Sequence, residues 1–423
     1  GYARSKNSIG VVFTSTGPGA ANITGSLVEA RFAGTSLIHI TGQTASENLD
    51  KKQGTVHEVP NQLDMLKSVS KQAFRINNTD EVLSILIEAF QCALTPPTGP
   101  VSIEIPIDIQ RSLIEKPLKI PYVKINEKDL FLGDIDSIDQ IEKSIRNFDR
   151  KILWIGNGAK TLKSEVKKFM ELGFAVVTST QAKGVVDEEE SMCIGAFNSL
   201  PSVEKFYSTV DLMIIVGSRL RGHETRDMSL KLPKNLIQID IDQQAKDRTY
   251  KTSLFHLGDA KKVLDELLNR LSDFSKPKEE WFEEVKSLKQ NIIEDYKSFL
   301  GVYKNFPEIV RECMPKSGRW VRDVTISNST WGNRMMPVSE ASENIFPVGA
   351  GIGPGMPLAI GASLAKADVK SIAMCGDGGF MLNLPELWTA VEVNSNVIFM
   401  IMNDKGYGVI KHIQDSLYGG RKN

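Results

Sequence analysis

The stretch GDGGF at residues 376–380, followed by NDKGYG at residues 403–408, decides how this chain folds. The apolar run 371–375 before the first motif predicts a buried strand, and the apolar run 396–402 before the second motif predicts another. Residues 384–392 between the two runs predict a helix. A strand, a helix and a strand in this order form a βαβ unit, whose strands are parallel and whose crossover is right-handed.

Asp377 and Asp404 each follow the carboxyl end of a predicted strand, which is the edge where open parallel sheets bind their ligands. Two carboxylates that meet there repel each other unless a cation lies between them, and Mg²⁺ is the usual cation where a phosphate shares the site. The glycines at 378 and 379 leave backbone N–H groups free to face that phosphate. The residues alone therefore predict Mg²⁺ with a diphosphate. The alternative is two ordinary turns that begin on Asp, a residue that turns favour.

The two motifs and their spacing of 27 positions (404 − 377) resemble the thiamine-diphosphate (ThDP) signature of the acetolactate synthase and 2-oxo acid decarboxylase superfamily. The resemblance implies ThDP and Mg²⁺ as cofactors. It implies that Mg²⁺ is bound by Asp377, by the side chain of Asp404 and by the backbone carbonyl of Gly406. The remaining residues that it assigns to the diphosphate or to packing on ThDP are Gly376, Gly378, Gly379, Asn403, Tyr407, Ser327 and Asn328.

A glycine-rich loop at 349–355 precedes the first motif. Ile352 lies 25 positions before Asp377 (377 − 352), where the family places the bulky apolar residue that keeps ThDP bent. The same alignment implies that the carbonyl of Ala350 accepts a hydrogen bond from the 4′-amino group of ThDP. The surrounding glycines allow the backbone to approach the rings closely. The alternative is a glycine-rich loop with a core isoleucine.

The family activates ThDP with a glutamate that lies about nine residues before the glycine of GYAR, and here that position falls before residue 1. Neither Glu29 nor Glu104 occupies its place in the motif, so this chain by itself is expected not to turn over substrate. His57 stands where acetolactate synthases carry Gln, and a neutral imidazole there could transfer the protons of the reaction. The alternative is a histidine in a surface loop.

The chain has 423 residues, 41% hydrophobic and 24% charged, with a net charge of −1. Its length predicts two to three domains, and its charge does not favour nucleic acid or an anionic membrane as partner. Four scattered cysteines without CxxC spacing predict reduced thiols and a cytoplasmic setting. No apolar run is long enough to predict a membrane span. Because the chain lacks an initiator Met and stops soon after the second motif, we expect its first and last domains to be truncated.

The expected fold class is α/β, with three doubly wound parallel-sheet domains. Strands are predicted at 9–14, 36–41 and 100–106, and the segments GYAR, STGPGAAN, HITGQ and GPVSIEIPID resemble the family's pyrimidine-binding domain. Further strands are predicted near 151–155, 212–217 and 236–242. The expected parts are a pyrimidine-binding domain (1–118), a central Rossmann-like domain (129–272), a helical linker (273–305) and a diphosphate-binding domain (306–423).

The central domain of some relatives holds FAD or a nucleotide, and the sequence leaves this open here. Gly156 and Gly158 lack the third glycine of GxGxxG, which disfavours NAD. Arg219, Arg221 and Arg226 follow a predicted strand, where they either bind a nucleotide phosphate or form ordinary solvated surface.

The resemblance implies decarboxylation of a small 2-oxo acid, with carboligation of the enamine to a second carbonyl, as in acetolactate synthase. The alternatives are a simple 2-oxo acid or acyl-CoA decarboxylase or lyase, a non-catalytic subunit with the ThDP fold, and a protein that only binds a nucleotide. The family's architecture also implies a homodimer or homotetramer with the cofactor at the interface between subunits.

Overall fold

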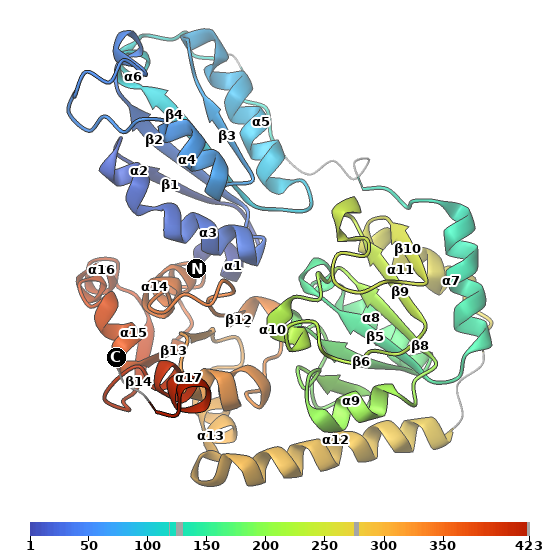
Figure 1. Ribbon diagram of the computed structural model, residues 1–423. Helices are drawn as coiled ribbons and strands as arrows, with labels where there is room; N and C mark the ends of the chain where they lie inside the picture. The colour runs from blue at the N-terminus through green and yellow to red at the C-terminus, as the bar shows by residue number, and fades with distance from the viewer. Residues whose placement is uncertain (118, 124–129, 275–278, 421–423) are drawn as a thin grey trace. The chain divides into compact units, whose positions relative to one another are not determined.

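A computed structural model describes residues 1–117, 119–123, 130–274 and 279–420 of the chain. These residues form two compact units. The N-terminal unit holds residues 2–129 together with 347–351, and the C-terminal unit holds residues 130–346 and 352–423 with Gly1. The described residues contain three sheets, all of them parallel, which confirms the predicted fold class (Figure 1).

The N-terminal unit contains a four-stranded sheet of order β1-β2-β4-β3. Ile38, Val101 and Ile103 from its central strands pack with Ala89 and Ala93 of the longest helix, and all five are fully buried. The predicted strands are confirmed within one or two residues, whereas β3 was missed because it is short and polar. The elements are β1 (Gly10–Thr14), β2 (Leu37–Gln43), β3 (Gln72–Arg75), β4 (Pro100–Pro106), α1 (Tyr2–Lys6), α2 (Pro18–Asn22), α3 (Thr24–Ala33), α4 (Gln62–Val69), α5 (Val82–Leu94) and α6 (Ile107–Arg111).

The first sheet of the C-terminal unit has six strands in the order β10-β9-β8-β5-β6-β7. This order is typical of doubly wound dinucleotide-binding sheets, in which the connection reverses between the first and fourth strands. Every residue of β5, β6, β8 and β9 is buried, as continuous apolar runs predict. The elements are β5 (Lys151–Ile155), β6 (Phe174–Thr178), β7 (Cys193–Gly195), β8 (Leu212–Val216), β9 (Leu236–Asp240), β10 (Leu254–Leu257), α7 (Ile135–Asn147), α8 (Lys163–Glu171), α9 (Pro201–Tyr207), α10 (Gly222–Thr225) and α11 (Ala260–Arg270).

A long helix, α12 (Glu279–Leu300), follows the six-stranded sheet. Trp281, Val285 and Ile292 are buried along one side of it, as their spacing of four and seven residues in a helix favours. The indole N–H of Trp281 donates to the carbonyl of Gly173 at 2.9 Å, so the start of the helix is held against the central sheet. The expected linker is therefore a packed helix and not an extended spacer.

The last sheet has the strand order β12-β11-β13-β14 and contains the predicted βαβ unit. β13 and β14 pair in parallel with Gly376 opposite Met402, so the residues that follow, Asp377 and Asn403, leave the sheet at the same edge. Asp377 begins a short helix and not a loop. The elements are β11 (Trp320–Arg322), β12 (Asn344–Ile345), β13 (Ser371–Gly376), β14 (Val397–Met402), α13 (Phe306–Cys313), α14 (Gly355–Leu364), α15 (Asp377–Leu382), α16 (Glu386–Glu392) and α17 (Gly408–Tyr418).

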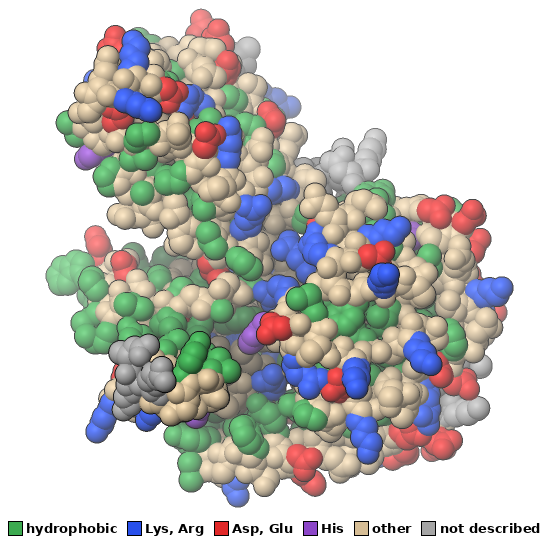
Figure 2. All heavy atoms as spheres, viewed as in Figure 1, with side chains coloured by type: hydrophobic (Ala, Val, Ile, Leu, Met, Phe, Trp, Pro, Cys, Tyr) green, Lys and Arg blue, Asp and Glu red, His purple; other side chains and the backbone are tan. Residues whose placement is uncertain are grey.

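Hydrophobic side chains gather on the surface over α15, α16 and α17 (Figure 2). Trp388, Val391 and Leu417 are each at least 70% exposed. An apolar surface of this kind is typically covered, either by a partner or by further chain. No helix among the described residues is long and apolar enough to cross a membrane.

Candidate cofactor site

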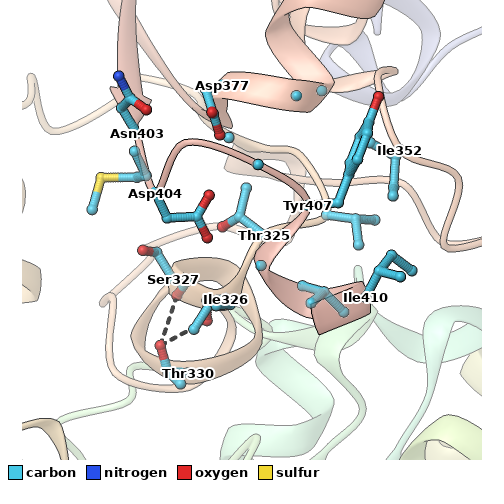
Figure 3. A pocket seen from close by; sticks show the side chains of 18 of the residues that line it. Thr325, Ile326, Ser327, Thr330, Ile352, Asp377, Asn403, Asp404, Tyr407 and Ile410 are labelled. Carbon is cyan, nitrogen blue, oxygen red and sulfur yellow. Dashed lines mark hydrogen bonds between the residues drawn. The ribbon is translucent and has the colours of Figure 1, made fainter. Parts of the chain in front are cut away.

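A pocket of about 390 Å³ lies at the carboxyl edge of the last sheet (Figure 3). Its walls come from the turn after β11, the start of α15, the segment after β14, the start of α17 and the end of α12. All of these belong to the C-terminal unit. The structure brings together at this pocket most of the predicted site residues, namely Ser327, Ile352, Gly376, Asp377, Gly378, Gly379, Asn403, Asp404, Gly406 and Tyr407.

Asp377 and Asp404 both contribute their carboxylates to the pocket. Oδ1 of Asp377 is buried and has no hydrogen-bond donor. A carboxylate oxygen can only accept, and burying one without a donor or a cation is costly. Asp377 and Asp404 therefore fit a hard divalent cation. Among the described residues no group of three or more His, Cys, Asp or Glu side chains could hold a metal ion. Such a cation would therefore need further oxygen ligands from the backbone and from a bound diphosphate.

The glycines of the two motifs allow neighbouring side chains to pack directly against the backbone around the pocket. A Cβ on Gly378 would lie 2.7 Å from Cε1 of Tyr407, and a Cβ on Gly379 would lie 2.6 Å from Oδ2 of Asp323. A Cβ on Gly408 would collide with the carboxylate of Asp404. Each of these positions lacks room for a side chain, which explains in steric terms why the motifs carry glycine there.

Ile352 lines the pocket, whereas the residue two positions before it is grouped with the other unit. In the N-terminal unit the N–H groups of Val348 and Gly349 each donate to the carboxylate of Glu29 at 2.7 Å. Ala350 follows with a φ of 61°, in the left-handed region that favours glycine. Its carbonyl stays a predicted partner of ThDP.

Ser327 lines the pocket, but its neighbour Asn328 is directed elsewhere. Asn328 is buried, and its Oδ1 accepts from Nε of Arg322 at 2.8 Å. The other two nitrogens of this fully buried guanidinium donate to Asn344 and Asn333 at 2.7 Å and 2.9 Å. Asn328 therefore takes part in a core network and does not face the pocket.

His57 is an exposed residue of the N-terminal unit, with a φ of 64°. Its backbone carbonyl lies against Gly17, where a Cβ would collide with it. The N–H of Gly17 donates to Oε1 of Gln62 at 2.8 Å, and Nε2 of Gln62 reaches the fully buried Glu104 at 3.0 Å. The structure thus fixes the backbone around His57 and leaves its imidazole accessible, while its proposed proton transfer stays a prediction.

The three arginines near the central sheet differ in their surroundings. Arg221 and Arg226 form ion pairs with Glu224 and Glu204. Burial lowers the pKa of Arg219. These contacts use part of the positive charge that a nucleotide phosphate would need, and binding of FAD or a nucleotide stays an open prediction.

Several residues of the pocket were not predicted. Thr325 and Thr330 come from the segment after β11, a strand of only three residues that gave no apolar signal. Leu300 and Tyr303 come from the end of the linker, in which no site residue was predicted. The buried side of α12 could be predicted from the spacing of its apolar residues. Nothing in the sequence indicated that the last turn of α12 borders the pocket.

Comparison with known proteins points to one family. Three family models match in order along the chain: thiamine pyrophosphate enzyme, N-terminal TPP binding domain (residues 1–65), thiamine pyrophosphate enzyme, central domain (138–267), and thiamine pyrophosphate enzyme, C-terminal TPP binding domain (326–423). The third match includes both motifs of the pocket.

Curated relatives match over the whole chain. The chain is 28% identical to a probable acetolactate synthase large subunit of Methanococcus aeolicus, with 100% of this chain and 74% of the relative covered. It is 26% identical to the acetolactate synthase large subunit of Haemophilus influenzae, with 100% and 75% covered. It is 24% identical to the chloroplastic acetolactate synthase 1 of Zea mays, with 99% and 67% covered. The chain therefore belongs to the thiamine pyrophosphate enzyme family and carries its N-terminal, central and C-terminal domains in that order.

Proposed function

We propose that this protein is a ThDP- and Mg²⁺-dependent enzyme that decarboxylates a small 2-oxo acid and joins the remaining fragment to a second carbonyl compound. The observation that carries the proposal is the buried Oδ1 of Asp377, which lacks a donor and lies in one pocket with Asp404. A doubly charged cation satisfies both carboxylates and attracts a diphosphate to the same edge of the sheet. The names of the relatives support acetolactate synthesis as the reaction type.

The residues of the pocket divide into three groups by chemistry. Asp377, Asp404 and the carbonyl of Gly406 supply oxygen ligands for Mg²⁺. The N–H groups of Gly378 and Gly379, with the polar side chains of Asn403 and Ser327, supply donors for the diphosphate, while Gly376 allows its close approach. Ile352 and Tyr407 supply an apolar surface on which the rings of ThDP can rest. Asn328 has no place in this assignment because its side chain binds Arg322.

The cofactor supplies the chemistry that a protein side chain lacks, because bound ThDP offers a nucleophilic carbon and an electron sink for decarboxylation. The chain's part is to hold the rings in position, to exclude water and to handle protons. We assign proton transfer near the reacting carbon to His57, whose imidazole is accessible and is a side chain that can both accept and donate a proton. We also propose a homodimer or homotetramer, located in the cytoplasm, with the cofactor between subunits.

The test is the intact protein supplied with ThDP and Mg²⁺ and offered pyruvate and a panel of other 2-oxo acids. Released CO₂ and ketol products are both measured. We expect ketol to form in step with CO₂. Release of CO₂ with an aldehyde as the other product would instead identify a simple decarboxylase. Absence of ThDP binding would overturn the proposal.

Simple decarboxylation is the second candidate, and His57 favours it. Acetolactate synthases carry Gln at this position, and this difference weakens the case that the chain shares their substrate preference. An imidazole can protonate the bound fragment and release it as an aldehyde, which an amide cannot do. His57→Gln should therefore shift the product ratio toward ketol if this candidate is correct.

A further inference from the structure

Gly353, the residue directly after Ile352, is bound through both of its backbone groups. Its N–H donates to both carboxylate oxygens of Asp323, at 3.0 Å each, and its carbonyl accepts from Nδ2 of Asn383 at 2.9 Å. Its φ of 107° is one that residues with a side chain rarely adopt. The orientation of this peptide is therefore set from two sides by two side chains.

Asp323 is an unusual residue for a merely structural contact. It is fully buried, follows β11 directly and extends the sheet through its N–H, which donates to the carbonyl of Met374 at 2.8 Å. No ion pair to it exists among the described residues. Burial raises the pKa of its carboxyl, and backbone N–H groups of Val324, Gly353 and Gly355 act in the opposite direction. A buried carboxylate without a counter-ion is costly, so the contacts that Asp323 makes must offset that cost.

The position of Asp323 shows which parts of the site these contacts connect. A Cβ on Gly379 would lie 2.6 Å from Oδ2 of Asp323 and 3.4 Å from Cγ2 of Ile352. The Asp323 carboxylate therefore contacts the loop that carries Ile352 and also the glycine backbone at the start of α15. Asn383, just after α15, holds the same loop from the far side of Gly353. Together the two side chains connect the loop that carries Ile352 to the segments beside both ends of α15.

We propose that Asp323 and Asn383 are positioning residues for ThDP, which fix the Gly353 peptide and thereby set how far Ile352 projects under the rings of the cofactor. The inference rests on the proposed ThDP site. It concerns the ring end of the cofactor, because neither residue is placed among the ligands of Mg²⁺ or the donors to the diphosphate.

A double-mutant cycle on binding tests this proposal without using activity. Calorimetry measures the affinity of the intact protein for ThDP with Mg²⁺, and separately for inorganic diphosphate with Mg²⁺. The variants are Asp323→Asn, Asn383→Ala, Ile352→Ala and the two double variants with Ile352→Ala. The matched control is Glu343→Gln, which makes the same acid-to-amide change at a buried residue that lies outside the pocket.

We expect Asp323→Asn to weaken ThDP binding about tenfold, the size expected for loss of a hydrogen bond to a charged acceptor, and Asn383→Ala to weaken it about threefold. Affinity for magnesium diphosphate should stay within about twofold, and each double variant should bind ThDP no more weakly than Ile352→Ala, within about twofold. Glu343→Gln should bind like the wild type.

Losses that multiply in the double variants would overturn the proposal, because the residues would then act independently of Ile352. An equal loss of magnesium diphosphate binding would overturn it too, since the effect would lie at the wrong end of the cofactor. If Asp323→Asn does not fold, the Asn383→Ala cycle decides by the same criteria. Failure of the wild type to bind ThDP would instead refute the proposed function itself.

Discussion

A methyl group added to Gly378 would lie 2.7 Å from Cε1 and 2.9 Å from Cδ1 of Tyr407. The two residues belong to different motifs, one at the start of α15 and the other just before α17. Their contact brings the two motifs together across the pocket, and it leaves no room for a side chain at position 378.

Gly378→Ala should therefore displace the ring of Tyr407 and weaken ThDP binding about tenfold, corresponding to about 1.4 kcal/mol. Calorimetric titration of ThDP in the presence of Mg²⁺ measures the change. Gly25→Ala is the matched control, because a Cβ there has nothing within 4 Å and the residue lies within α3. Equal affinity of Gly378→Ala and Gly25→Ala would show that the Tyr407 contact does not shape the site.

Asp377→Ala should abolish Mg²⁺-dependent binding of ThDP and should not destabilise the cofactor-free protein by more than about 1 kcal/mol, because the side chain loses an oxygen that has no donor. Thermal unfolding is recorded with and without ThDP and Mg²⁺. The wild type should gain stability from the ligands, as linkage requires, and so should the control, whereas Asp377→Ala should not. The exposed Asp368→Ala serves as control, and ligand stabilisation retained in Asp377→Ala would refute the metal assignment.

His39 should make the stability of the protein depend on pH. Burial lowers its pKa to about 4, and its ring nitrogens lie 2.9 Å from the hydroxyl of Thr14 and 3.1 Å from that of Ser102. The unfolded chain binds a proton near the ordinary pKa of 6.5, so the unfolded state carries more protons between these values. Stability is thus highest above about pH 6.5 and falls as the pH drops toward about 4, by at most about 3 kcal/mol.

Urea unfolding midpoints of the wild type and of His39→Gln, measured from pH 4.5 to 7.5, check this prediction. The variant should lose the part of the pH dependence that belongs to the imidazole, whatever its stability at neutral pH. Parallel curves for the two proteins would show that His39 titrates alike in the folded and unfolded chain.

Arg322→Lys should destabilise the fold by about 2–5 kcal/mol, although it keeps the charge. A lysine has one nitrogen and cannot replace the three that donate to Asn328, Asn333 and Asn344, so buried amide oxygens lose their donors. Urea unfolding measures the loss. Arg146→Lys at the surface is the control and should change stability by less than about 1 kcal/mol. A similar effect of the two substitutions would mean that the three asparagines do not depend on the shape of the guanidinium.

Long apolar or periodic segments were predictable. β4 was placed at 100–106 without error because prolines bound an apolar run, and α11 begins after Asp259, whose side chain caps it by accepting from the N–H of Lys262. β11 was missed because a strand of three residues that ends in arginine is too short to show an apolar run or an alternation of apolar and polar residues. Its membership in the sheet depends on β12 and β13, which lie 24 and 51 positions later (344 − 320 and 371 − 320).

From the sequence alone, most of the longer strands and helices could be predicted, and so could the arrival of the segments that carry Asp377 and Asp404 at one sheet edge, because a parallel βαβ unit has only one edge at which both strands end. The three-dimensional fold was needed to show that Asn328 turns toward Arg322, that α12 ends at the pocket, and that Asp323 accepts a hydrogen bond from the peptide after Ile352. Side-chain direction and contacts between distant segments depend on packing in three dimensions, and neither motif spacing nor periodicity contains that information.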